Sequence, residues 1–168
     1  PGRDGLPAVT THARYRLGTA TDVPALVRLI NSAYRVEAFF LHGDRTSAPD
    51  VLAKLEAPAS AFLVIEGPGG LAGAVHVEVR GERGYFGLLS VDPAHQGQGL
   101  GRVLVEAAEA HCRTAGCQAL DIDVVNLRTE LPPFYAKFGF RPTGVTPFPA
   151  PSKLKQPVHL VVMSKPLA

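Results

Sequence analysis

The feature that most constrains the fold is a strand that leads through a glycine-rich turn into a helix. The mostly apolar segment 85–91 predicts a strand, residues 92–101 predict a loop, and residues 102–115 predict a helix. A further strand is expected over 119–125, which is rich in β-branched residues. This order defines a β-α-β unit, which implies a parallel strand pair with a right-handed crossover. We therefore expect an α/β fold.

The rest of the chain adds elements around this unit. Capping residues followed by a proline predict helices that start near Thr21 and Ser47. The other expected elements are a strand at 14–17, a hairpin of 61–65 and 71–80, a short helix at 132–137, a strand near Phe140 and a last strand at 158–163. We predict a single domain over 13–168, with a mixed central sheet flanked by helices, and a flexible N-terminal tail over 1–12.

Composition narrows the possible partners. The chain holds 17 Lys and Arg against 15 Asp and Glu, and a formal net charge of +2 is too small to indicate a nucleic-acid partner. No apolar run approaches the roughly 18–20 residues of a membrane span, so no membrane partner is expected. Cys112 and Cys117 are the only cysteines and have no metal-ligand spacing, which favours a reduced, cytoplasmic protein without a metal. We expect a monomer or a homodimer.

The turn from Gln96 to Gly101 has the chemistry of a phosphate site. Glycines let backbone N–H groups approach an anion, and the first-turn donors of a helix have no partners of their own. Arg102 adds a positive charge at the first helical turn. A dinucleotide-binding fingerprint would need a glycine where Arg102 stands, and the Gly-Lys-Ser or Gly-Lys-Thr of a P-loop is absent. The turn fits neither pattern.

Two motifs resemble those of a known family. Gln96-x-x-Gly99-x-Gly101, after a Val-Asp-Pro step, resembles the acetyl-CoA motif of the GNAT superfamily of acyl-CoA N-acyltransferases. The segment 134–140 is similar to the Tyr-x-Lys/Arg-x-Gly-Phe ending of the same family, and the order of strands and helices matches over 14–163. The resemblance implies a GNAT-like fold and an acetyl-CoA-dependent N-acetyltransferase.

The resemblance also implies a donor site. In the family, the strands that here are 85–91 and 119–125 splay apart, and the pantetheine arm of acetyl-CoA lies between them. The cofactor-binding residues implied are Leu89, Ser90, Val91, Gln96, Gly97, Gln98, Gly99, Leu100, Gly101, Arg102 and Asn126. The backbone of Leu89 and Val91 would hold the arm, and the turn would hold the pyrophosphate. For Asn126 a strand-end cap is the alternative role.

Tyr135 matches the general acid of the family, which protonates the departing CoA thiolate. A tyrosine suits this role because its ordinary pKa of about 10 keeps it protonated at neutral pH. The implied reaction is direct attack of a primary amine on the thioester in a ternary complex, with the oxyanion held by a backbone N–H near Leu89 or Val91. Ser90 and Cys117 lack the base and orienting partner that a nucleophile needs.

The sequence does not identify the general base or the acceptor amine. Strand 85–91 carries no general base. The candidates elsewhere are Glu37, His42, His76 and Glu78, whereas a structural or solvent role is favoured for Asp121 and Asp123. The acceptor is expected to be a small-molecule or peptide amine, and a small, partly apolar amine is the best guess, in a pocket formed by 34–46 and 146–159. A non-catalytic acetyl-CoA sensor or assembly subunit is the alternative.

Overall fold

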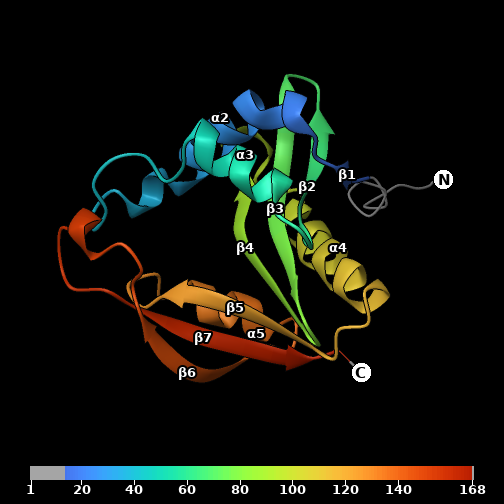
Figure 1. The fold of residues 1–168 in the computed structure, drawn as a ribbon. Coiled ribbons are helices and arrows are strands. Elements are labelled where there is room, and N and C mark those ends of the chain that lie inside the picture. Colours follow the sequence, from blue (N-terminus) through green and yellow to red (C-terminus); the bar gives the residue numbers. More distant parts are fainter. Residues whose placement is uncertain (1–13, 168) are drawn as a thin grey trace.

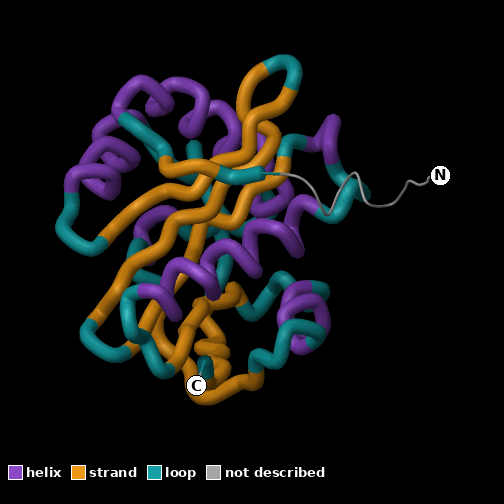
Figure 2. The backbone as a smooth tube through the Cα atoms, turned by 90° about the vertical axis from the view of Figure 1, so that its right-hand side faces the viewer, coloured by secondary structure: helices purple, strands orange, loops and turns teal. Residues whose placement is uncertain are grey.

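The computed structural model describes residues 14–167, which form a seven-stranded mixed sheet with helices on both faces (Figures 1 and 2). In chain order the elements, with η for 3-10 helices, are β1 (Arg16–Leu17), η1 (Ala20–Asp22), α2 (Val23–Ala33), η2 (Tyr34–Glu37), α3 (Ala48–Glu56), β2 (Ser60–Gly67), β3 (Gly70–Arg80), β4 (Arg83–Val91), η3 (Pro93–His95), α4 (Leu100–Thr114), β5 (Ala119–Val125), α5 (Leu131–Ala136), β6 (Arg141–Pro147), η4 (Pro151–Lys153) and β7 (His159–Pro166). The strand order is β1-β2-β3-β4-β5-β7-β6. The expected single α/β domain with a mixed sheet is confirmed, while the predicted tail over 1–12 lies outside the described residues.

The parallel pair β4–β5 is joined at one end only. Its register runs from Arg83↔Ala119 to Tyr85↔Asp121, and beyond this point the two strands diverge (Figure 1). At the joined end, the Arg83 guanidinium donates to both carboxylate oxygens of Asp121 at 2.7 and 2.8 Å. We call this ion pair the clasp. Ser164 of β7 donates to the same carboxylate at 2.6 Å. The splayed strand pair predicted from the motifs is confirmed.

A β-bulge coincides with the divergence. The β3–β4 register shifts between Ala74 and His76, and Leu88 adopts a left-handed conformation with φ 52°. The Ser90 hydroxyl donates to the Leu88 carbonyl at 3.0 Å and stabilises the bulge. Because a bulge bends its strand and increases the local twist, β4 turns away from β5 here.

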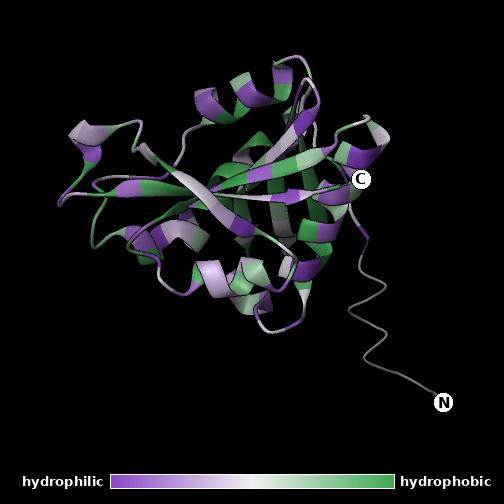
Figure 3. Cartoon of the chain, turned by 90° about the horizontal axis from the view of Figure 1, so that it is seen from below, coloured by the Kyte–Doolittle hydropathy of each residue, from purple (hydrophilic) through white to green (hydrophobic). Residues whose placement is uncertain are grey.

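Two hydrophobic cores lie on opposite faces of the sheet. On one face α4 and α5 pack over strand residues such as Phe86 and Leu120, and on the other α2 and α3 pack over strand residues such as Phe62 and Val64. Figure 3 shows hydrophobic residues concentrated at the centre of the molecule. The sheet is therefore covered on both faces, as expected for an α/β fold. Within residues 14–167, no helix is long and apolar enough to cross a membrane.

Helix starts follow their local chemistry. Ser47 caps α3 as predicted, since its hydroxyl accepts the Asp50 N–H at 3.4 Å. The start of α4 corrects the sequence-based boundary: the helix begins at Leu100 rather than Arg102, because Gly99 takes the N-cap position with φ 80°. Leu100 and Gly101 therefore belong to the first helical turn rather than to the loop.

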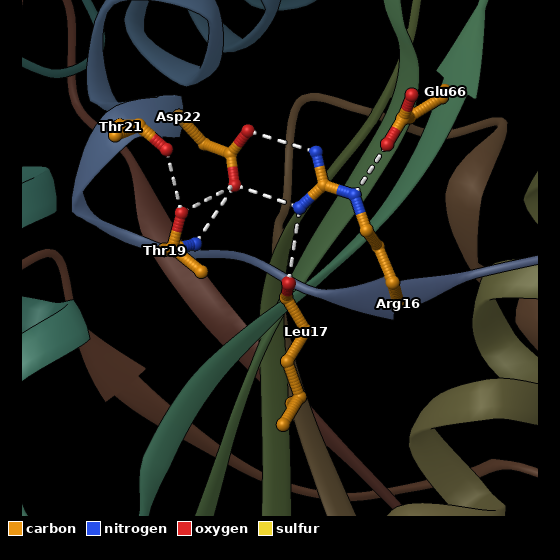
Figure 4. A network of polar contacts seen from close by, with 6 residues as sticks. All are labelled: Arg16, Leu17, Thr19, Thr21, Asp22 and Glu66. Atoms are coloured by element: carbon orange, nitrogen blue, oxygen red, sulfur yellow. Dashed lines mark hydrogen bonds and ion pairs between the residues drawn. The ribbon is translucent and has the colours of Figure 1, made fainter.

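Ion pairs anchor the first strand to the rest of the sheet. Arg16 of β1 binds both carboxylate oxygens of Asp22, just before α2, and its Nε binds Glu66 on β2 (Figure 4). The hydrogen bonds from Arg16 lower the pKa of Asp22 to about 2. The network ties the start of α2 to β1 and β2 at one edge of the sheet.

Candidate active site

The glycine turn forms a cradle at the start of α4. Gly97 and Gly99 have φ of 82° and 80°, a region that only glycine enters without strain. A cavity of about 320 Å³ opens on the cradle; of the predicted donor residues, Val91, Gln96, Gly97, Gly99, Leu100, Gly101 and Arg102 line it. Gln98 instead lines a neighbouring groove beside the β2–β3 turn. The cradle offers unpaired first-turn N–H groups, the donors that suit a phosphate.

Arg102 adds a cation to the cradle. Its guanidinium lies 5.0 Å from the centre of the Phe138 ring and 3.6 Å from Glu106, one turn along α4. With 60% of the side chain exposed, its charge is well solvated and adds modestly to anion binding.

A channel of about 470 Å³ leads from the cradle into the gap between the splayed strands. It shares Val91, Gln96, Gly101 and Phe134 with the cradle. The Asp92 N–H donates to Ala72 of β3 at 2.8 Å, and successive strand residues point their backbone groups to opposite edges. The backbone of Val91, and of Leu89 two residues earlier, therefore faces the gap, where β5 no longer pairs with β4.

A third cavity, the acceptor cavity, continues from the channel on the face covered by α2. Its volume is about 220 Å³. It shares Tyr34, Leu89, Leu131 and Tyr135 with the channel, so the three cavities are contiguous. A ligand can thus extend from the cradle to Tyr135, where a second ligand can approach from the other side.

Tyr135 is fixed in place at the junction of channel and acceptor cavity. Its ring packs against Phe86, Phe134 and Phe140, with ring centres 5.0 to 6.0 Å away. Burial raises the pKa of Tyr135 well above its usual value, so the phenol keeps its proton at neutral pH. No described residue hydrogen bonds to its hydroxyl, which leaves the O–H free for a ligand.

Two more tyrosines line the acceptor cavity. Burial raises the pKa of Tyr34 and of Tyr85 to about 12, and charge on either one further raises the pKa of Tyr135. The Tyr85 hydroxyl lies over Gly87, where an added Cβ would stand only 2.7 Å away. Gly87 thus makes room for the Tyr85 side chain. The motifs did not point to either tyrosine.

The candidates for the general base that were named from the sequence lie in different parts of the structure. Glu37 lines the acceptor cavity, but its carboxylate accepts a hydrogen bond from Arg128 at 2.9 Å. Burial raises the pKa of Glu37, and Arg45 and Arg128 oppose this rise. Glu37 therefore acts as an ion-pair partner that ties η2 to the segment after β5.

The histidine candidates lie away from the three cavities. His76 is buried against Phe62 and shares a hydrogen bond of 2.9 Å with Ser60. Burial lowers its pKa to about 4, so it is neutral at pH 7. Neither His42 nor Glu78 lines any of the three cavities, and Glu78 pairs with Arg80 at 2.7 Å.

Asp121 and Asp123 share a strand face but differ in their surroundings. Asp121 is held in the clasp by Arg83, which lowers its pKa, and has the structural role favoured above. Asp123 lies two residues beyond the clasp, lines the acceptor cavity and has no hydrogen-bond partner among the described residues. Although solvent reaches it, partial burial raises its pKa.

Three further residues named from the sequence have local contacts. The Asn126 side-chain oxygen accepts the His159 N–H at 2.9 Å, which is the strand-end cap considered as its alternative, and Asn126 lines none of the three cavities. Contact between Asn126 and the cofactor stays a prediction. The Ser90 side chain is buried under the bulge, and Cys117 is a buried free thiol, so neither meets the cavities as a nucleophile.

The two segments expected to form the acceptor pocket meet at its outer end, at the left of Figure 1. We call residues 38–42 together with 153–156 the loop bridge. Its contacts are the Leu41–Leu154 β-bridge and hydrogen bonds from His42 N–H to the Lys153 carbonyl (2.8 Å), from Lys155 N–H to the Phe40 carbonyl (2.8 Å), from Lys155 Nζ to the Ala38 carbonyl (2.6 Å) and from Gln156 Nε2 to the Phe39 carbonyl (3.3 Å). Leu41 and Lys153 of the loop bridge line the acceptor cavity.

A gap between parallel strands that opens at a helix N-terminus suits a ligand with an extended arm and a phosphate-containing tail, a class of ligand that includes acyl carriers. Comparison with known proteins narrows this class. The sequence profile described as the acetyltransferase (GNAT) family matches residues 24–140. The chain therefore belongs to the GNAT acetyltransferase family, and the resemblance found in its motifs is confirmed. No three His, Cys, Asp or Glu side chains within residues 14–167 gather as a metal site.

Individual relatives agree with this assignment. A candidate ribosomal protein bS18-alanine N-acetyltransferase of Bacillus subtilis is 28% identical over 116 residues, which cover 69% of this chain and 77% of the relative. The ribosomal-protein-S18-alanine N-acetyltransferase of Escherichia coli has a similar structure, with a TM-score of 0.73, 19% identity and coverage of 92% and 94% of the two chains. The structure of yncA, a candidate acetyltransferase from Salmonella typhimurium with its cofactor acetyl-CoA, gives a TM-score of 0.73 at 22% identity, with coverage of 92% and 94%.

Proposed function

We propose that the chain transfers an acetyl group from acetyl-CoA to a primary amine by direct attack in a ternary complex, with Tyr135 as general acid. The observation that carries this proposal is the continuity of the three cavities, with Tyr135 at the junction between channel and acceptor cavity. The named activities of the relatives support an amine acceptor, and the acetyl-CoA in the yncA structure supports the donor.

The donor residues follow from the cavities that they line. The first-turn N–H groups of α4, the glycine turn and Arg102 would bind the pyrophosphate, because they combine unpaired donors with a positive charge. The backbone groups of Leu89 and Val91 that face the gap would pair with the amides of the pantetheine arm. Asn126 keeps its side-chain nitrogen free as a donor, since only its oxygen is used by His159.

The chemistry requires one group to supply a proton and another to remove one. The amine nitrogen forms a bond with the carbonyl carbon, and the resulting oxyanion is stabilised by a backbone N–H of Leu89 or Val91. The C–S bond then breaks and Tyr135 gives its proton to the thiolate. We propose that Asp123 takes the proton of the amine. Asp44 and Asp123 are the two carboxylates in the acceptor cavity that no described residue pairs with, and Asp123 is the one on β5, beside the gap between the splayed strands.

The second candidate function is that of a non-catalytic acetyl-CoA sensor or assembly subunit, which would bind acetyl-CoA in the same channel. The free hydroxyl of Tyr135 favours the enzyme, since a protein that only binds acetyl-CoA has no need of a proton donor at the point where channel and acceptor cavity meet.

Tyr135→Phe tests the proposal. CoA should raise the melting temperature of wild type and variant equally. With acetyl-CoA and an amine panel, free-thiol release should fall about 100- to 10,000-fold in the variant, the range of general acid catalysis. The matched control is Tyr15→Phe, because Tyr15 is exposed and lines neither the channel nor the acceptor cavity. Unchanged turnover in Tyr135→Phe would remove Tyr135 from the mechanism, and a wild type that CoA does not stabilise would refute the donor site.

A further inference from the structure

We infer that the acceptor is a small amine that also carries a carboxylate, and that the guanidinium of Arg45 binds this carboxylate. The inference names the substrate class of the proposed acetyl transfer and rests on that proposal. Three observations carry it: the unpaired donors of Arg45, the unpaired carboxylate of Asp123 in the same cavity, and the small volume of that cavity.

Arg45 lies between η2 and α3 and lines the acceptor cavity. No described residue accepts a hydrogen bond from its half-buried guanidinium. Its described contacts are the Tyr34 ring, with 5.3 Å between the guanidinium carbon and the ring centre, and Glu37, with 3.9 Å between Nε and Oε1. Glu37 already accepts a hydrogen bond from Arg128 at 2.9 Å through its other oxygen. All five N–H donors of Arg45 are therefore available to a ligand.

A carboxylate is the group that fits these donors. The planar guanidinium presents a fork that matches two carboxylate oxygens, and such charge-assisted pairs are about twice as strong as neutral hydrogen bonds. The cavity also holds the opposite charge, because Asp123 can receive an ammonium group. Tyr85, Asp123 and Arg45 all line this cavity. Burial raises the pKa of Tyr85 to about 12, with Asp123 adding to the rise and Arg80 and Arg45 opposing it. A cation and an anion in one small cavity suit an amine that bears an acid group.

Two other charged residues line the cavity without competing for this role. Asp44 and Lys153 are exposed to solvent at its outer end. Ion pairs in such exposed positions are screened and contribute little to binding. The half-buried Arg45 is therefore the side chain that can select for a carboxylate.

The size of the cavity favours a small acceptor over a polypeptide. The acceptor cavity measures about 220 Å³, a volume that accommodates a small molecule. Leu41 and Lys153 of the loop bridge line it, and the bridge joins the segment after η2 to the segment around η4 by paired backbone groups. These contacts hold one wall of the cavity in place.

Matched acceptors test the inference on the whole protein. After a screen of amino acids with acetyl-CoA, the best one is compared with its amide, its decarboxylated amine and a peptide that begins with the same residue. The wild-type kcat/KM for the free acid should exceed that for each of the others by about tenfold or more, as expected for a charged hydrogen bond. In Arg45→Gln this preference should vanish, in Arg45→Lys it should be partly retained, and in the control Arg35→Gln, on the exposed face of η2, it should be unchanged.

The outcomes separate the two proposals. If no amine is acetylated although CoA raises the melting temperature, the proposed acetyl transfer fails, and the inference fails with it. If amines are acetylated but the amide, the decarboxylated amine or the peptide is used as well as the free acid, acetyl transfer stands and the inference is overturned. An acid preference that survives in Arg45→Gln also overturns the role of Arg45. The wild-type comparison needs no variant, so a poorly folding Arg45→Gln protein does not prevent the test.

Discussion

The donor and acceptor ends of the site are built from different parts of the chain. The donor cradle is mostly backbone from one continuous stretch, residues 96–102, in which Gly97 and Gly99 hold φ near 80°. The acceptor cavity is built from side chains that come from separate elements, namely Tyr34, Arg45, Tyr85, Asp123 and Tyr135. Side-chain substitutions should therefore alter the acceptor end while acetyl-CoA binding is kept, and backbone changes should do the reverse.

After Tyr135→Phe, the largest effect is expected at the acceptor end, from Asp123→Asn. The amide keeps the shape of the carboxylate but cannot accept the proton of the amine, so kcat/KM at neutral pH should fall about 100-fold while the KM for acetyl-CoA stays unchanged. Burial raises the pKa of Asp123, and activity requires its ionised form. Wild-type kcat/KM should thus fall as pH drops through this raised pKa, and the fall should be absent in Asp123→Asn.

Asp121→Asn is the matched control for this prediction. Asp121 lies on the same strand face, but it is tied to Arg83 in the clasp, and the hydrogen bonds from Arg83 lower its pKa. Its ionised form stabilises the fold above the ordinary carboxyl pKa, and this stabilisation is lost as pH falls through the lowered value. Asp121→Asn should therefore lower the melting temperature and leave the pH profile of kcat/KM in place. If the fall of kcat/KM at low pH were absent in both variants, this result would contradict the proposed role of Asp123.

The difference between these two aspartates shows where sequence reasoning stops. The alternation of a strand places Asp121 and Asp123 on one face. What separates them is the end of β4–β5 pairing at Tyr85↔Asp121, which depends on register and on the bulge at Leu88. A leucine with positive φ has no sequence signal, since local strain is sustained by the surrounding sheet. The sequence alone therefore favoured the same structural role for both.

The donor end could be predicted because its signals are local. Glycines next to a helix start report a backbone conformation, and Tyr135 follows within a recognisable motif. The acceptor end depends instead on contacts between residues far apart in the chain, such as Glu37 with Arg128, 91 positions away. Parts of the two segments expected from the sequence, 34–46 and 146–159, line the same cavity. The loop bridge and the placement of the Arg45 guanidinium in that cavity arise only from tertiary packing.

A backbone change at the donor end should affect the KM for acetyl-CoA rather than the use of the acceptor. Its effect should be smaller than that of Asp123→Asn on kcat/KM. Gly99→Val puts a β-branched residue at φ 80°, a conformation that costs L-residues roughly 1–2 kcal/mol or more. The distorted cradle should raise the KM for acetyl-CoA about tenfold and leave the acceptor KM unchanged. The control is Gly81→Val, because Gly81 has φ 65° in the remote β3–β4 turn with open space around it. Gly81→Val should lose stability without a change in either KM.

The smallest effect is expected for Arg102, which with Lys137 is one of two cationic side chains that line the cavity at the cradle. In Arg102→Gln the exposed cation is lost, while the backbone donors of α4 and the glycine turn remain. Exposed ion pairs are worth about 0.2–1 kcal/mol, so the KM for acetyl-CoA should rise only about two- to fivefold, and less at high salt. The control is Arg28→Gln on the exposed surface of α2, which should leave this KM unchanged. If Arg102→Gln instead raises the KM by 100-fold, a side chain dominates donor binding, and the contrast between a backbone-built donor end and a side-chain-built acceptor end does not hold.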